Sequence, residues 1–506
     1  MIAEMSILAV LAIPLLGSVL TAAMTSPRKM EIVYLLSAVA SLVAALWLAA
    51  EVATHGTVFW LDGFLYADSL SALMVLLTSF VYLVTAPYAV GYFRHDERYA
   101  EKDQIFGESN DAPTSRAKLR KYYALVPLFA FCMFLVAVSN NLGVMWVAVE
   151  GTTLASIFLV TFYARPTSLE AAWKYAILGG VGLSMALFGT VLTYYSAYQV
   201  LGGDSLSALN WSVLVDAAPR FGHPAMRLAF ILVLLGYGTK AGLAPMHTWK
   251  PDAYSEAPIP VAILMATAVL NCSLYALARF YVLTSRCLGP GFASQLLVLF
   301  GLVTVGIAVP FILVQRNYRR LLAYSSIDHA GIMVLSLGFG GVLGPLGMLL
   351  HMTFHTITKP LLFFCAGNGQ QHMGNDSLRK GPGGLLHVLP VSAPLFLLGA
   401  LAVTGTPPFS MFQSEFMVLR AGFAAQQTGL VMLFAAFLVA IFCGLFYHVS
   451  QLVLGPSTGV PRGDSSRWKT YPAIGLAGIV VLLSFWLPAP LYSLVENAAR
   501  ILVVNP

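Results

Sequence analysis

Charged residues are scarce in this sequence: lysine, arginine, aspartate and glutamate together make up 10% of its 506 residues. Soluble domains typically carry about 25%. The shortage, together with a hydrophobic fraction of 58%, excludes a water-soluble globular protein. The formal net charge is +6, but no basic run marks a nucleic-acid-binding face. The composition therefore predicts a polytopic membrane protein whose length is used by membrane spans.

Cofactor-binding motifs are missing as well. The five cysteines stand alone without a C-x-x-C pair, which argues against an iron–sulfur cluster, a zinc site or a disulfide framework. Neither a G-x-G-x-x-G fingerprint nor a Walker loop is present. We therefore expect no cofactor in this chain. If the protein takes part in redox chemistry, other subunits hold the redox groups.

Apolar runs of about 20 residues, the length of a membrane-spanning helix, recur along the whole chain. The acidic start of the sequence disfavours a signal peptide, so the first run is interpreted as a span. We count fourteen spans, roughly 5–24, 31–51, 69–91, 122–138, 141–163, 171–196, 227–245, 258–283, 291–315, 319–339, 344–368, 385–424, 429–454 and 470–492. The sequence predicts an all-α polytopic membrane protein with about 14 transmembrane helices.

Lysine and arginine gather in alternate loops. Cytoplasmic loops are enriched in positive charge, so all of these loops are expected on the cytoplasmic side, which puts both termini outside. We expect a multi-pass protein of the cell inner membrane. The basic residues are Arg28 and Lys29; Arg94, Arg98, Lys102, Arg116, Lys118, Arg120 and Lys121; Arg316, Arg319 and Arg320; Arg379 and Lys380; and Arg462, Arg467 and Lys469.

Two apolar segments are interrupted by glycine and proline, at Gly242-Leu-Ala-Pro245 in the seventh span and Gly405-Thr-Pro-Pro408 in the twelfth. Broken helices at membrane depth are typical of ion and substrate pathways. The breaks lie five spans apart, which gives them opposite orientations and predicts two inverted five-helix repeats; two unrelated proline kinks are the alternative. The expected division is 1–120 for helices 1–3 and a basic cytoplasmic loop, 121–285 and 286–455 for the repeats (helices 4–8 and 9–13), and 456–506 for helix 14.

Charged residues lie inside several predicted spans, where they are costly and usually functional. Lys240 directly precedes the first break, and Glu150 lies about 15 Å into the fifth span at about 1.5 Å per residue. We expect the two to form an ion pair that a proton weakens or remakes, with a purely structural salt bridge as the alternative. Lys174, near the start of the sixth span, either tunes this pair or snorkels to the membrane interface.

A second group of titratable residues follows in spans ten to twelve. His351, His355 and Lys359 are spaced four residues apart, so one helical face carries all three, as proton hopping requires. Metal binding by the two histidines is the rival, but no acidic third ligand is near in sequence. We expect His329 either to extend this line or to be a packing residue. Glu415, after the second break, is either a terminal proton site or an interfacial glutamate.

Three sequence patterns together resemble the antiporter-like proton-channel subunits of respiratory complex I and its relatives, which are also similar to Mrp-type antiporters. They are the stretch KAGLAPMHTWKPDAYSEAP from Lys240 to Pro258, the stretch Arg319-Arg-Leu-Leu-Ala-Tyr-Ser-Ser326, and His351-x3-His355-x3-Lys359-Pro. The likeness runs from about 120 to 425. The resemblance implies fourteen helices with two inverted repeats. It also implies that the functional charges fall on Glu150, Lys174, Lys240, His351, His355, Lys359 and Glu415.

The sequence departs from this family pattern at a few positions. Asn271 stands where many complex I members carry a lysine on the eighth helix, which removes one link of the usual central relay. Lys250 and Tyr254 replace the more usual leucine and histidine after the first break. The asparagine, with the stretches around Glu150 and Lys174, makes the chain most similar to the hydrogenase-4 component F group.

The resemblance implies a proton-translocating subunit of a complex-I-like oxidoreductase, of the hydrogenase-4, formate hydrogenlyase or NADH:quinone oxidoreductase type. Iron–sulfur clusters and nickel–iron or flavin would then belong to partner subunits, both membrane-bound and peripheral. The chain itself would be a non-redox, translocase-type subunit that moves protons, or Na⁺, within the lipid bilayer, with no nucleic acid as a partner. The alternatives are an Mrp-type Na⁺/H⁺ or K⁺/H⁺ antiporter subunit, and a scaffold that keeps the fold without pumping.

Overall fold

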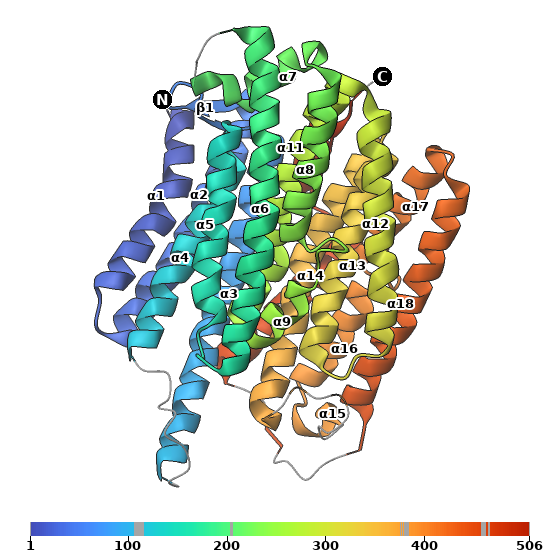
Figure 1. Ribbon diagram of the computed structural model, residues 1–506. Helices are drawn as coiled ribbons and strands as arrows, with labels where there is room; N and C mark the ends of the chain where they lie inside the picture. Colours follow the sequence, from blue (N-terminus) through green and yellow to red (C-terminus); the bar gives the residue numbers. More distant parts are fainter. Residues whose placement is uncertain are drawn as a thin grey trace.

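Long, mostly apolar helices run side by side through the molecule (Figure 1). The computed structural model describes residues 2–105, 116–202, 206–374, 376, 378, 384–456, 462–463 and 466–504. Within these ranges, 11 helices are long and apolar enough to cross a membrane. The chain is therefore an all-α, multi-pass membrane protein, as its composition predicts.

The first part of the chain forms six long helices and one short hairpin. The helices are α1 (Ile2–Ala23), α2 (Pro27–His55), α3 (Ser69–Ile105), α4 (Arg116–Val138), α5 (Leu142–Val160) and α6 (Pro166–Leu201). Between α2 and α3, strands β1 (Val58–Trp60) and β2 (Leu65–Ala67) pair antiparallel, with Phe59 opposite Tyr66. These helices correspond to the first six predicted spans.

The next part contains the first helix break. Its elements are η1 (Leu206–Leu209), α7 (Trp211–Ala217), η2 (Ala218–Arg220), α8 (His223–Ala241), α9 (Trp249–Glu256), α10 (Ile259–Leu264), the π-helical turn η3 (Met265–Val269) and α11 (Leu270–Leu288). The N–H of Gly242 donates to the carbonyl of Thr239, and the N–H of Leu243 donates to that of Gly238 at 2.8 Å. This Schellman turn needs a positive φ, which Gly242 adopts at 81° without a steric penalty. The chain then resumes as α9 on the far side of Pro245.

The second break ends its helix with the same kind of turn, which contains a glycine with a positive φ. It lies in the series α12 (Pro290–Leu313), α13 (Tyr318–Phe339), α14 (Leu343–Met373), α15 (Leu385–Val388), α16 (Ser392–Val403), α17 (Ser410–Ala424) and α18 (Thr428–Leu454). After α16, Gly405 has φ 64°, and the N–H of Thr406 donates to the carbonyl of Leu401 at 3.2 Å. Both predicted breaks are thus present. The inverted relation of the repeats, and the division of the chain into four parts, stay predictions.

The C-terminal region differs from its prediction. The expected span at 470–492 is two helices, α19 (Arg467–Phe485) and α20 (Ala489–Leu502). Pro488 explains the stop, since proline has no N–H to donate and disfavours a helical residue before it. The seventh, eleventh and twelfth predicted spans correspond to α8, α14 and the α16–α17 pair, which are not among the 11 helices above. The total of fourteen therefore stays a prediction. Arg379 and Lys380, used to predict the orientation, lie outside the described residues.

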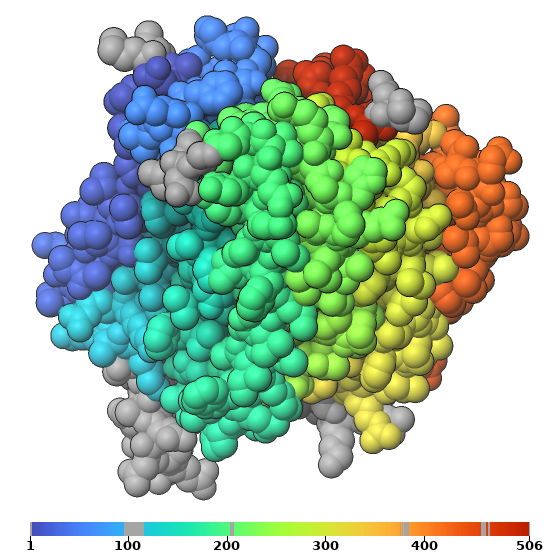
Figure 2. Space-filling model, turned by 45° about the horizontal axis from the view of Figure 1, so that its top comes forward, coloured from blue at the N-terminus to red at the C-terminus, as the bar shows by residue number. Residues whose placement is uncertain are grey.

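On the face that Figure 2 shows, the helices up to α18 follow one another in chain order, whereas α19 and α20 pack back against α3. Figure 2 shows the N-terminal helices in blue on one side, α6 and α8 in green in the middle, and α17 and α18 in orange on the other side. The segments Ile259–Leu288 and Tyr318–Phe339 are 100% buried along their most apolar stretch, whereas only 28% of that stretch is buried in Thr428–Leu454. The two central segments are therefore shielded by protein on all sides, where polar groups need protein partners.

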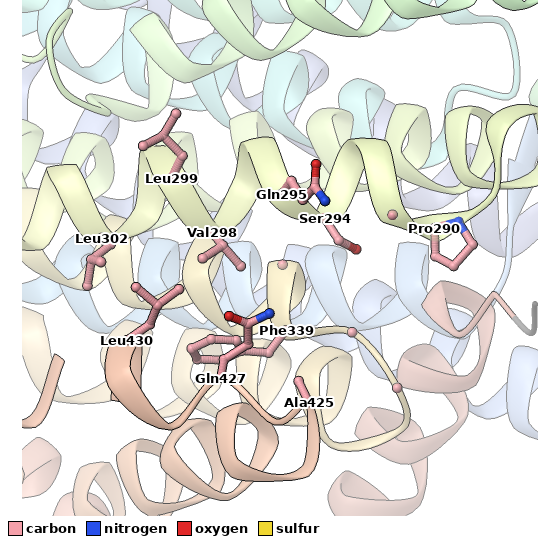
Figure 3. A pocket seen from close by; sticks show the side chains of 14 residues that line it. Pro290, Ser294, Gln295, Val298, Leu299, Leu302, Phe339, Ala425, Gln427 and Leu430 are labelled. Carbon is pink, nitrogen blue, oxygen red and sulfur yellow. The ribbon is translucent and has the colours of Figure 1, made fainter. Parts of the chain in front are cut away.

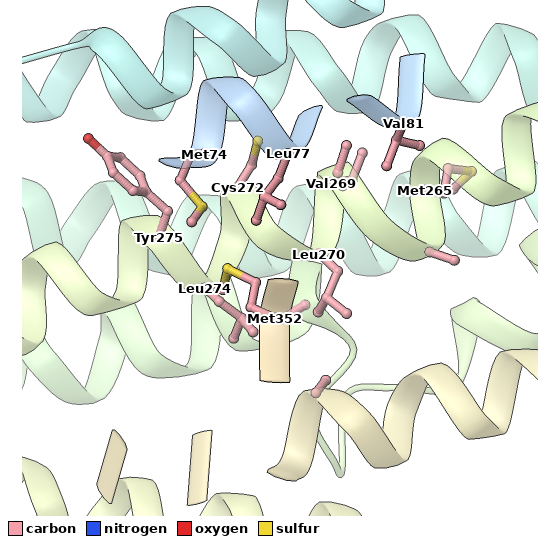
Figure 4. Close-up of a cluster of buried hydrophobic side chains, with 14 of the residues drawn as sticks. Met74, Leu77, Val81, Met265, Val269, Leu270, Cys272, Leu274, Tyr275 and Met352 are labelled. Atoms are coloured by element: carbon pink, nitrogen blue, oxygen red, sulfur yellow. The ribbon is translucent and has the colours of Figure 1, made fainter. Parts of the chain in front are cut away.

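The centre is packed by apolar side chains from α3, α11 and α14. Figure 4 shows Met74 and Leu77 of α3 close to Cys272 of α11, with Met352 of α14 beside Leu274. These side chains are at most 3% exposed. They pack the three helices closely together, so polar side chains at this depth are surrounded by protein.

Candidate functional site

Lys240 lies in the last turn of α8, with 1% of its surface exposed. Its ammonium nitrogen donates to Thr153 Oγ1 of α5 at 2.7 Å and to the hydroxyl of Tyr175 of α6. It also lies 4.8 Å from the centre of the Tyr175 ring, within the range of a cation–π contact. Lys240 is therefore held by neutral hydroxyl groups from two helices.

The expected ion pair between Glu150 and Lys240 is not formed directly. Among the ion pairs of the described residues none joins the two, and Glu150 Oε2 is buried with no hydrogen-bond partner in these ranges. The carboxylate still acts on Lys240 through its charge. The hydroxyls of Thr153 and Tyr175 are the hydrogen-bond partners of the ammonium group instead.

Lys174 does not lie beside Lys240, contrary to one of the two expectations for it. Its side chain is 48% exposed and pairs with Glu170 at 2.7 Å and with Asp252 of α9 at 3.1 Å. Its neighbour Tyr175 contacts Lys240 instead, since successive side chains on a helix point in different directions. The interfacial alternative therefore fits the structure, and a functional role for Lys174 stays a prediction.

The three histidines of spans ten and eleven come together in the buried centre. His329 Nδ1 of α13 lies 3.0 Å from His351 Nε2 of α14, and the ring centres of His329 and His355 are 4.9 Å apart. His351 Nδ1 in turn lies 3.0 Å from Ser414 Oγ of α17. All three rings are at most 2% exposed. The structure therefore includes His329 in the line and extends that line to α17.

Lys359 and Asp328 add opposite charges to this cluster. Lys359 Nζ and Asp328 Oδ1 are buried and make no hydrogen bond to the residues that the structure describes. Their charges act on each other across the α13–α14 interface. Sequence reasoning missed Asp328, although an acidic residue next to His329 inside a predicted span was the signal that could have found it.

Glu415 of α17 is buried, with 7% of its surface exposed. Its carboxylate packs against Gly405 in the second break so closely that a β-carbon at Gly405 would overlap it. Ser414, the residue before Glu415 on α17, bonds to His351, and the charge of Asp328, the residue before His329, acts on Glu415. The burial of Glu415 does not fit an interfacial glutamate. It fits a proton site at the end of the series of titratable residues.

Two further buried polar residues bond to the helices that carry Lys240 and the histidines. Lys250, which sequence reasoning noted only as an unusual residue, is 1% exposed at the start of α9. Asn271 of α11 donates through Nδ2 to Thr356 Oγ1 of α14 at 2.8 Å. An amide does not take up a proton near neutral pH, so Asn271 contributes a hydrogen bond but no titratable group.

The described ranges contain no group of three or more His, Cys, Asp or Glu side chains that could hold a metal ion. A cavity of about 550 Å³ lies elsewhere, between α12, the end of α13 and the turn before α18 (Figure 3). Figure 3 shows Leu299, Leu302 and Leu430 around it, with the amides of Gln295 and Gln427 on the other part of its wall. Its lining includes none of the titratable residues above.

Comparison with known proteins supports one family. Residues 139–441 match the family described as NADH:quinone oxidoreductase/Mrp antiporter, TM. The hydrogenase-4 component F homolog of Methylacidiphilum infernorum is 36% identical over 462 residues, which are 91% of this chain and 92% of that protein. NADH-quinone oxidoreductase subunit N of Dehalococcoides mccartyi is 28% identical over 490 residues, covering 94% of each chain.

Solved structures show the same fold. A chain of the archaeal membrane-bound sulfane sulfur reductase superposes with a TM-score of 0.84 at 22% identity, covering 98% of this chain and 97% of that one. A chain of the Mrp complex from Dietzia sp. gives 0.83 at 21% identity, with the same coverage. The motifs, the family match and the fold agree. The chain belongs to the NADH:quinone oxidoreductase/Mrp antiporter family of membrane subunits.

Proposed function

We propose that this chain is a proton-translocating membrane subunit of a complex-I-like oxidoreductase of the hydrogenase-4 type. It couples electron transfer in partner subunits to proton movement through its own buried residues. The observation that carries this proposal is the line of buried titratable side chains from Lys240 through the three histidines to Glu415. Buried charges of this kind are costly in a membrane and are usually found on ion pathways.

The contacts of Lys240 suit a group that gains and loses a proton. A charged ammonium group has three N–H donors and a neutral amine has two. Both forms can therefore keep the hydrogen bonds to Thr153 and Tyr175. Lys240 can release a proton without losing its position, and the charge of Glu150 biases that release.

The histidine line can pass a proton by exchanging tautomers. Each neutral imidazole donates through one nitrogen and accepts through the other. The contacts from His329 to His351 and from His351 to Ser414 join these nitrogens and the hydroxyl in one series. A proton that enters at His329 can thus pass to His351 and reach Ser414, the residue before Glu415.

The partners follow from the same proposal. Two similar proteins carry the names hydrogenase-4 component F homolog and NADH-quinone oxidoreductase subunit N, and subunits of such complexes need redox partners. We propose that membrane and peripheral partner subunits hold iron–sulfur clusters and nickel–iron or flavin, while this chain holds none. We also propose the cell inner membrane as its location, with both termini outside.

The test uses the whole complex, purified through a tag on this chain and reconstituted in lipid vesicles. Mass spectrometry identifies the co-purifying subunits, and a pH-sensitive dye measures electron-driven proton uptake. We expect a large hydrogenase-like subunit with iron–sulfur proteins. We also expect Lys240→Ala and His355→Ala to abolish proton uptake while the complex still assembles, with the exposed Lys121→Met as control. Normal proton uptake in both inner variants would contradict the proposal.

An Mrp-type Na⁺/H⁺ or K⁺/H⁺ antiporter subunit is the second candidate. The structural similarity to a chain of the Mrp complex favours it at the level of the fold. Recovery of the chain with small membrane subunits only, and cation-dependent proton exchange without an electron donor, would select this function.

A further inference from the structure

Lys250 is a buried lysine bonded to backbone carbonyls of two helices. It follows the first break, near the start of α9. Its Nζ donates to the carbonyl of Ala241, at the end of α8, at 2.7 Å and more weakly to that of Ser326 of α13 at 3.5 Å. Its side chain packs directly over Gly242, where a β-carbon would lie 2.6 Å from Lys250 Cδ. Because Gly242 has no β-carbon, the Lys250 side chain fits against the backbone of the break.

A structural role for Lys250 explains only part of this arrangement. A lysine near a helix C-terminus commonly bonds to the last carbonyls. Such a cap needs no burial, however, and the Schellman turn already bonds to two carbonyls of α8. Lys250 is 1% exposed, and no carboxylate in the described ranges pairs with it. Its two acceptors suit a neutral amine, which has two N–H donors, as well as a charged one.

Lys250 joins the two helices that carry Lys240 and His329. Ala241, which accepts its hydrogen bond, is the residue after Lys240. Ser326, its other acceptor, is one helical turn before His329 on α13. The charge of Lys250 also acts on His329, His355 and Lys359. Asn271 of α11 also bonds to α14, the helix of His351 and His355, but its amide cannot take up a proton.

We propose that Lys250 carries the proton from Lys240 to the histidines, in place of a titratable group at Asn271. In the first step the Lys240 ammonium gives one proton to the neutral amine of Lys250 and becomes neutral. In the second step the Lys250 ammonium gives that proton to the imidazole of His355 or His329 and becomes neutral again. One proton moves and no other bond changes. This role rests on the proposed function.

Two substitutions of Lys250 in the intact complex distinguish a role as a proton carrier from a role as a helix cap. Lys250→Arg keeps a cation that can bond to both carbonyls, but arginine does not release its proton. Lys250→Met keeps the length of the side chain and removes the amine. We expect both complexes to assemble and both to fall to the proton-uptake level of Lys240→Ala, while the exposed Lys121→Met stays at the wild-type level. Wild-type uptake in Lys250→Arg would overturn the proposal and leave Lys250 as a helix cap.

A second experiment does not depend on whether arginine fits into the buried space that Lys250 occupies. Asn271 bonds to Thr356 on α14, the helix that carries His351 and His355, so a lysine at 271 would place an amine against that helix. We expect Asn271→Lys to restore proton uptake when it is combined with Lys250→Met. A double variant that assembles and remains inactive would overturn the carrier role.

The proposed function and the role of Lys250 are overturned by different results. Wild-type uptake in Lys240→Ala and His355→Ala would remove the proposed function itself. Loss of uptake in those two variants, with wild-type uptake in both Lys250 variants, would remove only the role of Lys250.

Discussion

His329 and His351 meet across the α13–α14 interface, with Nδ1 of the first 3.0 Å from Nε2 of the second. Only one of these two nitrogens can carry the hydrogen when both rings are neutral, so the two tautomers are coupled. The contact of His351 with Ser414 at 3.0 Å extends this coupling to α17, the helix that begins after the second break. A proton added at one end changes the hydrogen-bonding roles along the whole series.

Replacement of His351 is expected to interrupt this series. His351→Ala leaves His329 Nδ1 without its present partner, at a cost of about 1–3 kcal/mol for an unsatisfied buried polar group, whereas the Ser414 hydroxyl keeps its hydrogen bond to the carbonyl of Met411. We expect proton uptake to be lost and the melting temperature of the complex in detergent to fall. His448→Ala is the matched control, since that histidine contacts only the carbonyl of Leu313 among the described hydrogen bonds. Equal uptake in the two variants would contradict the expected role of His351.

Loss of the Tyr175 hydroxyl is expected to affect Lys240 with little effect on packing. Tyr175→Phe keeps the ring that stacks near Trp249 but removes the hydrogen bonds to Lys240 and Ser156. Lys240 then keeps Thr153 as its remaining hydroxyl partner. We expect slower proton uptake with normal assembly, measured at several pH values in vesicles. An unchanged rate at every pH would mean that the hydroxyl does not influence Lys240.

The second break is expected to be sensitive to a single methyl group. Gly405→Ala would strain a left-handed backbone by about 1–2 kcal/mol and also displace the Glu415 carboxylate. Gly289→Ala is the matched control, because that glycine has φ 78° but no atom within 4 Å of an added β-carbon. Both variants should lose stability, and Gly405→Ala alone should lose proton uptake. Similar uptake in the two variants would show that the packing of Glu415 against the break is not important.

A buried ion pair outside the polar line is expected to stabilise the bundle. Arg279 of α11 donates to both carboxylate oxygens of Asp68, just before α3, at 2.7 and 2.8 Å, and it lies 4.3 Å from the Trp211 ring. Removal of one partner of such a pair typically costs 3–5 kcal/mol. Arg279→Met should therefore unfold at a lower denaturant concentration, whereas Arg279→Met with Asp68→Asn should recover part of the loss. Additive losses in the double variant would exclude coupling between the two side chains.

Several features of the site could be predicted from the sequence because they depend on local chemistry. Gly242 and Gly405 predicted the breaks, since a helix that ends in a left-handed turn needs glycine there and proline blocks its continuation. His351, His355 and Lys359 were placed on one face by their spacing alone. Glu415 was expected beside the second break because it follows it closely in sequence. The structure agrees with each of these positions.

Contacts between helices could not be predicted in the same way. The expected Glu150–Lys240 pair gave way to hydroxyls from Thr153 and Tyr175. Hydropathy assigns a span but not the rotation of its helix, and a charged residue pairs with whatever polar group that rotation brings near. Lys250 was noted only as an unusual residue because its contacts lie on helices far away in sequence, whereas Asp328 had a local signal as an acidic residue inside a predicted span.

The sequence by itself determined the membrane class, the two helix breaks and the family, because these depend on composition, on backbone chemistry and on contiguous motifs. Only the tertiary structure decided which buried groups meet. His329 joins His351 and Ser414, and Lys250 lies between α8 and α13, because close packing of helices fixes side-chain neighbours that no single helix specifies.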